Sequence, residues 1–259
     1  MYVRCLGTFM VCMGDSEIVI QPCRRARLLI AFLVNANSVL SIDQISAELW
    51  GEDPCPGTAN SLHAQVSRLR KTLTGWAPVG LSTQYPGYVL TIDESSLDIT
   101  RFTHLAEACR RHWPAGPVAV VEHARQALAL WLGSPFPGHQ LGALGQMAKV
   151  RLEETRLATL EMLMDASLEL GQHRQSVGEL RQLVVAHPFQ EKFYEQLMLA
   201  LYRSGRQGEA LAAFEQARSR LSESLGVDPS PRLHQRMTQI LRHDPALWSP
   251  CDEHRLAAG

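Results

Sequence analysis

Apolar residues between positions 58 and 75 recur at spacings of four, three and four, at Leu62, Val66, Leu69 and Leu73. This spacing follows the turn of an α-helix and places the four side chains on one face. Thr58 is a favourable residue at the start of such a helix, and Gly75 is a favourable residue just after its end. The pattern predicts an amphipathic helix over residues 58–73.

The opposite face of this helix is polar and basic. At roughly 100° per residue it carries Asn60, Ala64, Ser67 and Lys71, with His63 and Arg70 along one edge and Arg68 along the other. No acidic residue interrupts it. Asn can bond bidentately to adenine, small residues allow a close approach to bases, and Arg or Lys binds guanine or phosphate. DNA is the first partner to consider, while a plain surface helix with a basic solvated face would show the same pattern.

Strand and helix signals alternate upstream of this segment. Residues 2–6, 9–12 and 18–20 have the composition of short strands, and Pro22 follows them. A helix is predicted from Arg24 to about Asn35, with Leu28, Leu29, Phe32 and Leu33 available for a core. A second helix is predicted from Ser41 to Trp50, because Ser41 followed by Gln44 fits a capping box.

Downstream, two β-prone runs, residues 79–83 and 88–92, are joined by Gln84, Tyr85, Pro86 and Gly87. Pro-Gly favours a hairpin turn. Three helices followed by a β-hairpin describe a winged helix, in which the third helix enters the major groove and the hairpin touches the backbone or the minor groove.

The second half of the chain contains an internal repeat. Gly171 and Gly205 lie 34 positions apart in similar surroundings, and a period of 34 with helix, turn and helix is typical of tetratricopeptide repeats. A further helix pair is predicted at residues 99–112 and 118–131, followed by a Gly/Pro-rich insertion over residues 133–145. Such repeats favour a platform for protein partners, and a helical packing or dimerisation domain is the alternative.

The predicted fold is therefore mixed and mainly α: an N-terminal winged helix with β-strands before it and a β-hairpin wing, followed by an all-α tetratricopeptide-like domain. We expect a DNA-binding domain over residues 1–93, a helical domain over residues 97–243 and a disordered tail over residues 244–259.

Composition narrows the class of protein without adding a site. With 259 residues, 46% apolar, 20% charged and a net charge of −1, the chain is that of an ordinary globular protein. Any DNA contact must come from a local basic patch. There is no run of apolar residues long enough to cross a bilayer and no signal peptide pattern, so we expect a cytoplasmic protein that associates with the nucleoid when bound to DNA, with no membrane partner.

Motifs of catalytic chemistry are absent from the sequence. Phosphate loops, dinucleotide-binding turns, H-E-x-x-H and G-x-S-x-G do not occur, and the ten histidines and six cysteines are scattered without ligand spacing. We expect no enzyme activity, no catalytic residue, no metal site and no cofactor.

Several short motifs, in order, resemble one protein family: Leu6-Gly7, Leu49-Trp50-Gly51, Val66-Ser67-Arg68-Leu69-Arg70-Lys71, Pro86-Gly87-Tyr88, Asp98 with Arg101-Phe102, residues 199–207 and Leu225-Gly226-Val227-Asp228-Pro229. The chain resembles the Streptomyces antibiotic regulatory proteins from Val3 to about Leu241. Members of that family combine an OmpR-like winged helix with a bacterial transcriptional activation domain of tetratricopeptide type.

The resemblance implies an activator of specialised-metabolite gene clusters that binds direct repeats near the promoter −35 region and contacts the RNA polymerase holoenzyme. Direct repeats suit head-to-tail copies spaced by about one helical turn of DNA, whereas a two-fold dimer would prefer a palindrome. The chain departs from its relatives at Ala59, where they often carry Arg, and at Gln84, where they often carry a basic wing residue. Both changes reduce the attraction for phosphate or the minor groove.

The predicted partner is double-stranded promoter DNA, and the predicted contact residues come from three segments. The third helix contributes Thr58, Asn60, Ser61, His63, Ala64, Ser67, Arg68, Arg70 and Lys71; the wing contributes Gln84, Tyr85 and Tyr88; and the start of the first helix contributes Arg24, Arg25 and Arg27. A tetratricopeptide adaptor that binds only protein, and a repressor that acts by promoter occlusion, are the alternatives.

Overall fold

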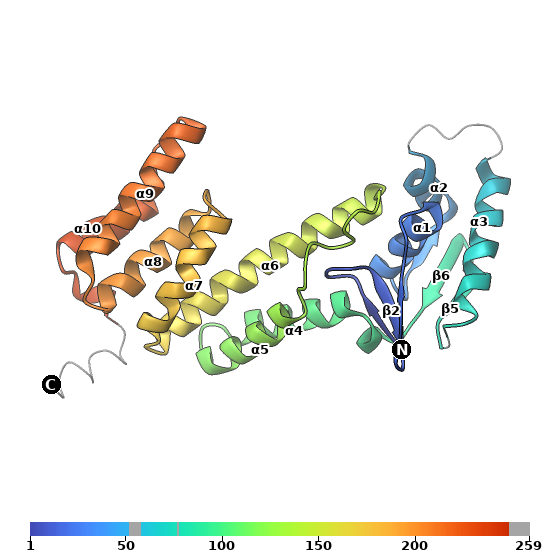
Figure 1. The fold of residues 1–259 in the computed structure, drawn as a ribbon, viewed down its shortest axis with the longest axis horizontal. Helices are drawn as coiled ribbons and strands as arrows, with labels where there is room; N and C mark the ends of the chain where they lie inside the picture. Colours follow the sequence, from blue (N-terminus) through green and yellow to red (C-terminus); the bar gives the residue numbers. More distant parts are fainter. Residues whose placement is uncertain (52–57, 77, 249–259) are drawn as a thin grey trace. The chain divides into compact units, whose positions relative to one another are not determined.

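A computed structural model describes residues 1–51, 58–76 and 78–248 of the chain, with the backbone alone for residues 58–60. By packing, the chain forms two compact units (Figure 1). The first comprises Met1–Glu107 and Gln126–Leu157, and the second comprises Ala108–Arg125 and the chain from Ala158 onward.

The first unit begins with an antiparallel sheet of three short strands, β1 (Tyr2–Arg4), β2 (Met10–Met13) and β3 (Ser16–Val19), in that order. Val3 pairs with Val11, and both side chains are buried, whereas all of β3 is exposed. The predicted strands in front of the winged helix are therefore confirmed.

Three helices follow: α1 (Arg24–Val34), α2 (Ile42–Trp50) and α3 (Thr58–Leu73). The apolar residues expected from the α1 pattern are its buried ones, Leu28, Leu29, Phe32 and Leu33 among them. The predicted capping box starts α2, since the Gln44 N–H donates to Ser41 Oγ at 3.1 Å and the Ser41 N–H donates to Gln44 Oε1 at 2.9 Å.

The wing is a hairpin of β5 (Gly80–Gln84) and β6 (Gly87–Thr91), as the sequence predicts. A third strand that the sequence did not predict, β4 (Val39–Ser41), pairs with β6 and places Leu40 opposite Tyr88. A Cβ atom on Gly87 would collide with the carbonyl oxygen of Leu40, so this close pairing requires glycine.

The core of the first unit continues beyond the hairpin, through η1 (Glu94–Ser96) into α4 (Asp98–His112) and α5 (Pro117–Ala129). Leu97 and Phe102 belong to the same apolar cluster as the residues of α1, and the Phe102 ring meets Trp131 edge-on with 5.3 Å between centroids. The buried carboxylate of Asp98 accepts the N–H groups of Cys5 and Leu6 at 2.7 and 2.8 Å. Packing thus joins segments on both sides of residues 93–97, and the predicted domain boundary there stays a prediction.

A single long helix, α6 (Ala143–Glu169), begins inside the predicted Gly/Pro-rich insertion, which therefore ends before Gly145. The buried carboxylate of Glu48, on α2, accepts the N–H groups of Gly142 and Leu144 at 2.9 and 2.7 Å. An anion at a helix N-terminus satisfies unpaired N–H groups and complements the helix dipole. Glu48 therefore fixes the start of α6 against the winged helix within the first unit.

The second unit contains the repeat: α7 (His173–Ala186), α8 (Glu191–Arg203), α9 (Gln207–Leu225) and α10 (Pro231–Leu241). Gly171 and Gly205, the two positions that define the period, have φ of +73° and +77° in the turns before α7 and α9. Glycine adopts this left-handed conformation without steric cost. Helix α8 packs against α7, α9 and α10.

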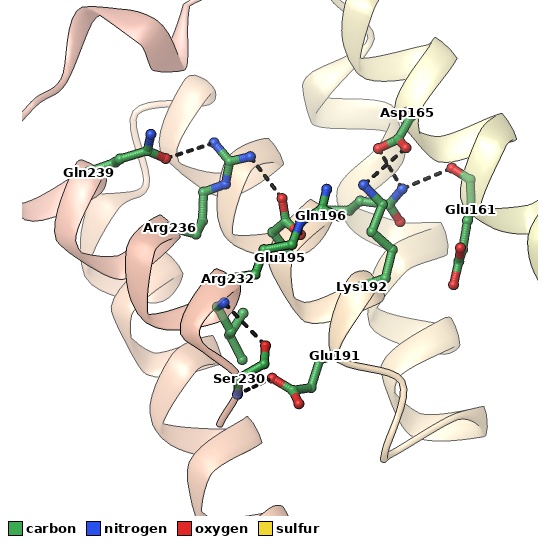
Figure 2. A network of polar contacts seen from close by, with 11 residues as sticks. Glu161, Asp165, Glu191, Lys192, Glu195, Gln196, Ser230, Arg232, Arg236 and Gln239 are labelled. Carbon is green, nitrogen blue, oxygen red and sulfur yellow. Dashed lines mark hydrogen bonds and ion pairs between the residues drawn. The ribbon is translucent and has the colours of Figure 1, made fainter. Parts of the chain in front are cut away.

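A polar network surrounds α8 (Figure 2). On one side, the buried carboxylate of Glu195 binds Arg232 Nε at 2.7 Å and Arg236 Nη2 at 2.9 Å, both from α10. On the other side, Lys192 Nζ lies 3.0 Å from a carboxylate oxygen of Asp165 on α6, and Gln196 donates to the second oxygen at 2.7 Å. The network links three helices through specific pairs, which fixes how they pack.

The chain after α10 continues as η2 (Pro245–Leu247), in which Leu247 is buried and its carbonyl accepts Arg203 Nε at 2.6 Å. The prediction of a disordered tail from residue 244 is wrong for residues 244–248, because Leu247 packs into the second unit. Residues 249–259 of the predicted tail lie outside the described residues.

Candidate nucleic-acid interface

Helix α3 buries the predicted stripe and exposes the predicted polar face. The relative exposure of Leu62, Val66, Leu69 and Leu73 is at most 2%. Exposed side chains on the other side are His63, Ala64, Ser67, Arg68, Arg70 and Lys71, and Ser61 is half-buried. Thr58 and Asn60 lie in the helix, but their side chains are outside the described residues, so their contacts stay predictions.

Two side chains of α3 tie it to the wing. Arg70 donates from Nε to the Leu81 carbonyl at 2.8 Å and from Nη2 to Thr83 Oγ1 at 3.4 Å. His63 Nδ1 lies 2.6 Å from the hydroxyl of Tyr88 on β6. The exposed face of α3 and the hairpin therefore form one surface whose geometry is fixed by side-chain hydrogen bonds. Pattern reading alone did not find these tethers, because each depends on a pairing distant in sequence.

The wing presents one large side chain at its tip. Tyr85 is 96% exposed in the turn between β5 and β6, and Gln84 beside it is also exposed. Tyr88, predicted as a third wing contact, is only 6% exposed, and its hydroxyl is bonded to His63. Tyr88 is thus placed to hold His63, and the direct DNA contact predicted for Tyr88 stays a prediction.

The three arginines at the start of α1 are not equivalent. Arg24 and Arg25 are exposed, and the Arg24 guanidinium lies 6.0 Å from the centre of the Trp50 ring. Arg27 instead donates to the carbonyl and side-chain oxygens of Gln140, both at 3.1 Å, and to the carbonyls of Glu48 and Leu49. Its guanidinium caps the end of α2, and the phosphate contact predicted for Arg27 stays a prediction.

The charge of this surface has one sign. From Thr58 to Ile92 the sequence contains no Asp or Glu. Within the described part of the chain, Arg68 and Lys71 have no carboxylate within ion-pair distance. A face with unpaired cations, no acids and small polar residues is suited to bind a polyanion.

Neither a cluster of metal ligands nor a membrane-spanning helix occurs among the described residues. Over the described ranges, with their gaps at 52–57, 77 and 249–259, no three His, Cys, Asp or Glu side chains gather as metal ligands would. No helix among those ranges has the length and apolar character needed to cross a membrane.

The chain matches two families of transcription regulators. Residues 97–241 match the family described as "Bacterial transcriptional activator domain", and residues 19–90 match "Transcriptional regulatory protein, C terminal". The regulatory protein DnrI of Streptomyces peucetius is 34% identical over 257 residues, covering 95% of this chain and 94% of DnrI. The regulatory protein AfsR of Streptomyces coelicolor is 39% identical over 239 residues, which cover 90% of this chain but 23% of AfsR.

A solved structure has the same fold. Mycobacterium tuberculosis EmbR, determined in complex with a low-affinity phosphopeptide, matches with a TM-score of 0.84 at 26% identity, over 94% of this chain and 65% of EmbR. The mainly helical fold with an N-terminal sheet and a winged helix is thereby confirmed. The chain belongs to the Streptomyces antibiotic regulatory protein family, whose members are transcriptional regulators with an OmpR-like DNA-binding domain and a bacterial transcriptional activator domain, not enzymes.

Proposed function

We propose that this protein activates transcription by binding direct repeats near the promoter −35 region and recruiting the RNA polymerase holoenzyme, and that its targets are specialised-metabolite genes. The observation that carries the DNA-binding part is the exposed face of α3, where Arg68 and Lys71 lie without acidic partners next to a tethered wing. The activating part rests on the family.

The proposed interface assigns different tasks to different residues. Base edges in the major groove are read by the first two turns of α3, with Asn60, His63, Ala64 and Ser67, and with Thr58 and Ser61 at its start. Phosphates are bound by Arg68 and Lys71 on α3 and by Arg24 and Arg25 on α1, all exposed where described. Gln84 and Tyr85 at the wing tip meet the adjacent backbone or minor groove.

Residues 1–93 carry this DNA-binding function in the proposal, and residues 97–243 carry the contact with polymerase. Because each α3 reads one half-site and the wing gives it a direction, two copies bind head to tail on a direct repeat. Their spacing is about one helical turn, ~10 to 11 base pairs, so that both lie on one face of the DNA.

A gel-shift experiment with synthetic duplexes tests the arrangement. A selected half-site is presented as a direct repeat, as an inverted repeat and with the spacing increased by half a turn. We expect tight, cooperative binding to the direct repeat and weaker binding to the other two. Equal affinity for direct and inverted repeats would refute the head-to-tail arrangement, and no retention of any fragment at low salt would favour a protein-binding adaptor.

Transcription in vitro with purified holoenzyme tests the outcome of binding. An activator raises the transcript yield from a promoter with the direct repeat next to the −35 element, and a promoter with a scrambled repeat is the control. A decrease in yield on the same template would instead show repression by promoter occlusion, with the DNA contacts unchanged.

A further inference from the structure

One imidazole on the proposed DNA face is held by a residue of the core. The Tyr88 hydroxyl lies 2.6 Å from His63 Nδ1, and the two rings meet at 68° with 6.3 Å between centroids. Tyr88 is 6% exposed on the central strand β6, whereas His63 is exposed on α3. The position of the His63 ring is thus set from the interior of the winged helix.

This hydrogen bond also bears on which nitrogen of His63 carries the proton. A neutral imidazole has one N–H donor and one acceptor nitrogen, and the partner of one nitrogen selects the tautomer. If the Tyr88 hydroxyl donates to Nδ1, the proton of the ring is on Nε2. Among the described residues, His63 Nδ1 is the one hydrogen-bond partner of the Tyr88 hydroxyl. The arrangement that pairs the phenol proton within the protein is therefore the one in which Nδ1 accepts and the His63 proton is on Nε2.

We propose that the Tyr88 hydroxyl holds His63 through Nδ1, with a proton of the imidazole on Nε2, and that this Nε2–H donates to the N7 atom of a purine in the major groove. The inference rests on the proposed function and specifies the chemistry of one of its contacts. His63 is a specificity-determining residue in this scheme, and Tyr88 is a positioning residue that acts through it.

The position of His63 favours a base over a phosphate. It lies in the first half of α3, and the first residues of a recognition helix are those that reach base edges. Its neighbours on the exposed face, Ala64 and Ser67, are small and allow the helix to approach. Purine N7 is an acceptor that the major groove presents for guanine and adenine, whereas cytosine presents a donor there. A lone N–H therefore discriminates against cytosine at that position.

The test combines three variants with modified DNA. Affinity is measured for the preferred repeat, for repeats with each base pair exchanged in turn, for repeats carrying 7-deazapurines, and for unrelated DNA. The variants are His63→Ala, Tyr88→Phe and the two together. Tyr202→Phe is the matched control, since its hydroxyl lies 3.2 Å from His243 Nδ1 on the second unit and it is similarly buried.

We expect His63→Ala and Tyr88→Phe each to lose about threefold to tenfold of the discrimination at the same base pair, with no further loss in the double variant. A 7-deazapurine at that pair should cost the wild-type protein the same factor and the His63→Ala variant nothing. Affinity for unrelated DNA, and the behaviour of Tyr202→Phe, should not change. The ¹⁵N chemical shifts of His63 should show Nε2–H in the wild type and a mixture of tautomers in Tyr88→Phe.

Several outcomes would overturn the inference. The first is an Nδ1–H tautomer of His63 in the wild-type protein. The second is a base preference in His63→Ala that is unchanged at every base pair, or a wild-type affinity that 7-deazapurines do not change. The third is a loss of affinity in His63→Ala that is the same for all DNA sequences, as the loss of a phosphate contact would give. If Tyr88→Phe does not fold, His63→Ala and the modified DNA still decide. If the wild-type protein retains no DNA at low salt, the proposed function itself fails, whichever tautomer is found.

Discussion

The basic residues of α3 and those around α8 differ in what they face. Around α8, Arg232 and Arg236 converge on the buried Glu195, and Lys192 pairs with Asp165 (Figure 2). On α3, Arg68 and Lys71 extend into solvent without a carboxylate partner among the described residues. The same residue types therefore hold helices together in one unit and remain available to an external anion in the other.

Net charge does not reveal this difference. The chain carries 25 basic and 26 acidic residues, and the average is almost neutral. The acids are concentrated elsewhere, and the segment from Thr58 to Ile92 has none. Unpaired cations on the surface distinguish a region that can bind DNA. Cations paired with buried carboxylates distinguish a network that holds the fold together.

The largest effect is expected from removing the acid at the centre of the α8 network. Glu195→Ala leaves Arg232 and Arg236 without their carboxylate, and Arg236 is itself mostly buried. We expect the free energy of unfolding to fall by about 3 kcal/mol, because a buried charge that loses its partner is strongly destabilising. Urea unfolding followed by far-UV circular dichroism measures this change.

Glu209→Ala is the matched control for that substitution. Glu209 also binds two arginines, Arg181 at 2.6 Å and Arg206 at 2.7 Å, but on the exposed surface. We expect its unfolding midpoint to stay close to that of the wild type, since solvent screens exposed pairs. Equal effects of the two substitutions would show that burial does not distinguish the network of α8 from surface ion pairs.

The second largest effect concerns the unpaired cations of α3. Each phosphate contact is worth about eightfold in affinity at 0.1 M salt relative to 1 M, through counterion release. Replacing Arg68 and Lys71 together by Ala should therefore lower affinity about 60-fold at 0.1 M salt. The slope of log affinity against log salt should become shallower by about 2, for every DNA sequence alike.

Arg125→Ala with Arg181→Ala is the control of equal charge. These two residues are exposed but paired, with Glu179 at 3.1 Å and Glu209 at 2.6 Å. Titrations by fluorescence anisotropy between 50 and 400 mM salt should give the wild-type slope for this control. The same loss of slope in both double variants would mean that total charge, and not the α3 face, governs binding.

The two regions were also unequally predictable from sequence. The buried stripe of α3 follows from the spacing of Leu62, Val66, Leu69 and Leu73, because helical periodicity is local. The capping box at Ser41 and the hairpin turn after Gln84 are likewise local signals. Strand β4 was missed because its three residues are defined by pairing with β6, about 50 positions away.

Side-chain partners that lie far apart in sequence were outside the reach of pattern reading. Nothing local distinguishes Arg70, which bonds to the wing, from Arg68, which is free, since both are exposed arginines on one helix. The partners of Glu48 and Asp98 could not be predicted from local sequence either. Each is a single acid beside apolar residues, and its partners are N–H groups of segments about 90 positions away.

Asp98 is a buried acid for which the described residues provide no cation within ion-pair distance, and it extends the comparison. Burial raises the pKa of its carboxyl above the ordinary value of 3.8, because lost hydration outweighs the hydrogen bonds from Leu6 and Cys5. At pH values between 3.8 and the raised pKa of the folded state, Asp98 is protonated in the folded protein and ionised in the unfolded chain. The folded state therefore binds more protons in this window. The free energy of unfolding therefore falls as pH rises through this window, by about 1.4 kcal/mol for each pH unit that the window spans.

Asp98→Asn isolates this contribution. The difference in unfolding free energy between the variant and the wild type should shift in favour of the variant as pH rises above 3.8. Asp93→Asn is a control of opposite sign, since hydrogen bonds from Ser95 lower the pKa of the exposed Asp93. Urea unfolding at several pH values measures both, and parallel curves for Asp98→Asn and the wild type would contradict the buried, ionised state.

The smallest effect is expected at Arg70, which lies on the DNA face but has its guanidinium bonded to the wing. Arg70→Ala should lower affinity only about threefold, by loosening the hairpin, and stability by less than about 1 kcal/mol. The amide protons of β5 should exchange faster with deuterium, while the salt slope stays that of the wild type. A slope reduced by about 0.9 would instead place Arg70 on a phosphate. Arg70 would then bind phosphate as Arg68 and Lys71 do. A cation that is hydrogen-bonded within the protein would in that case also bind DNA.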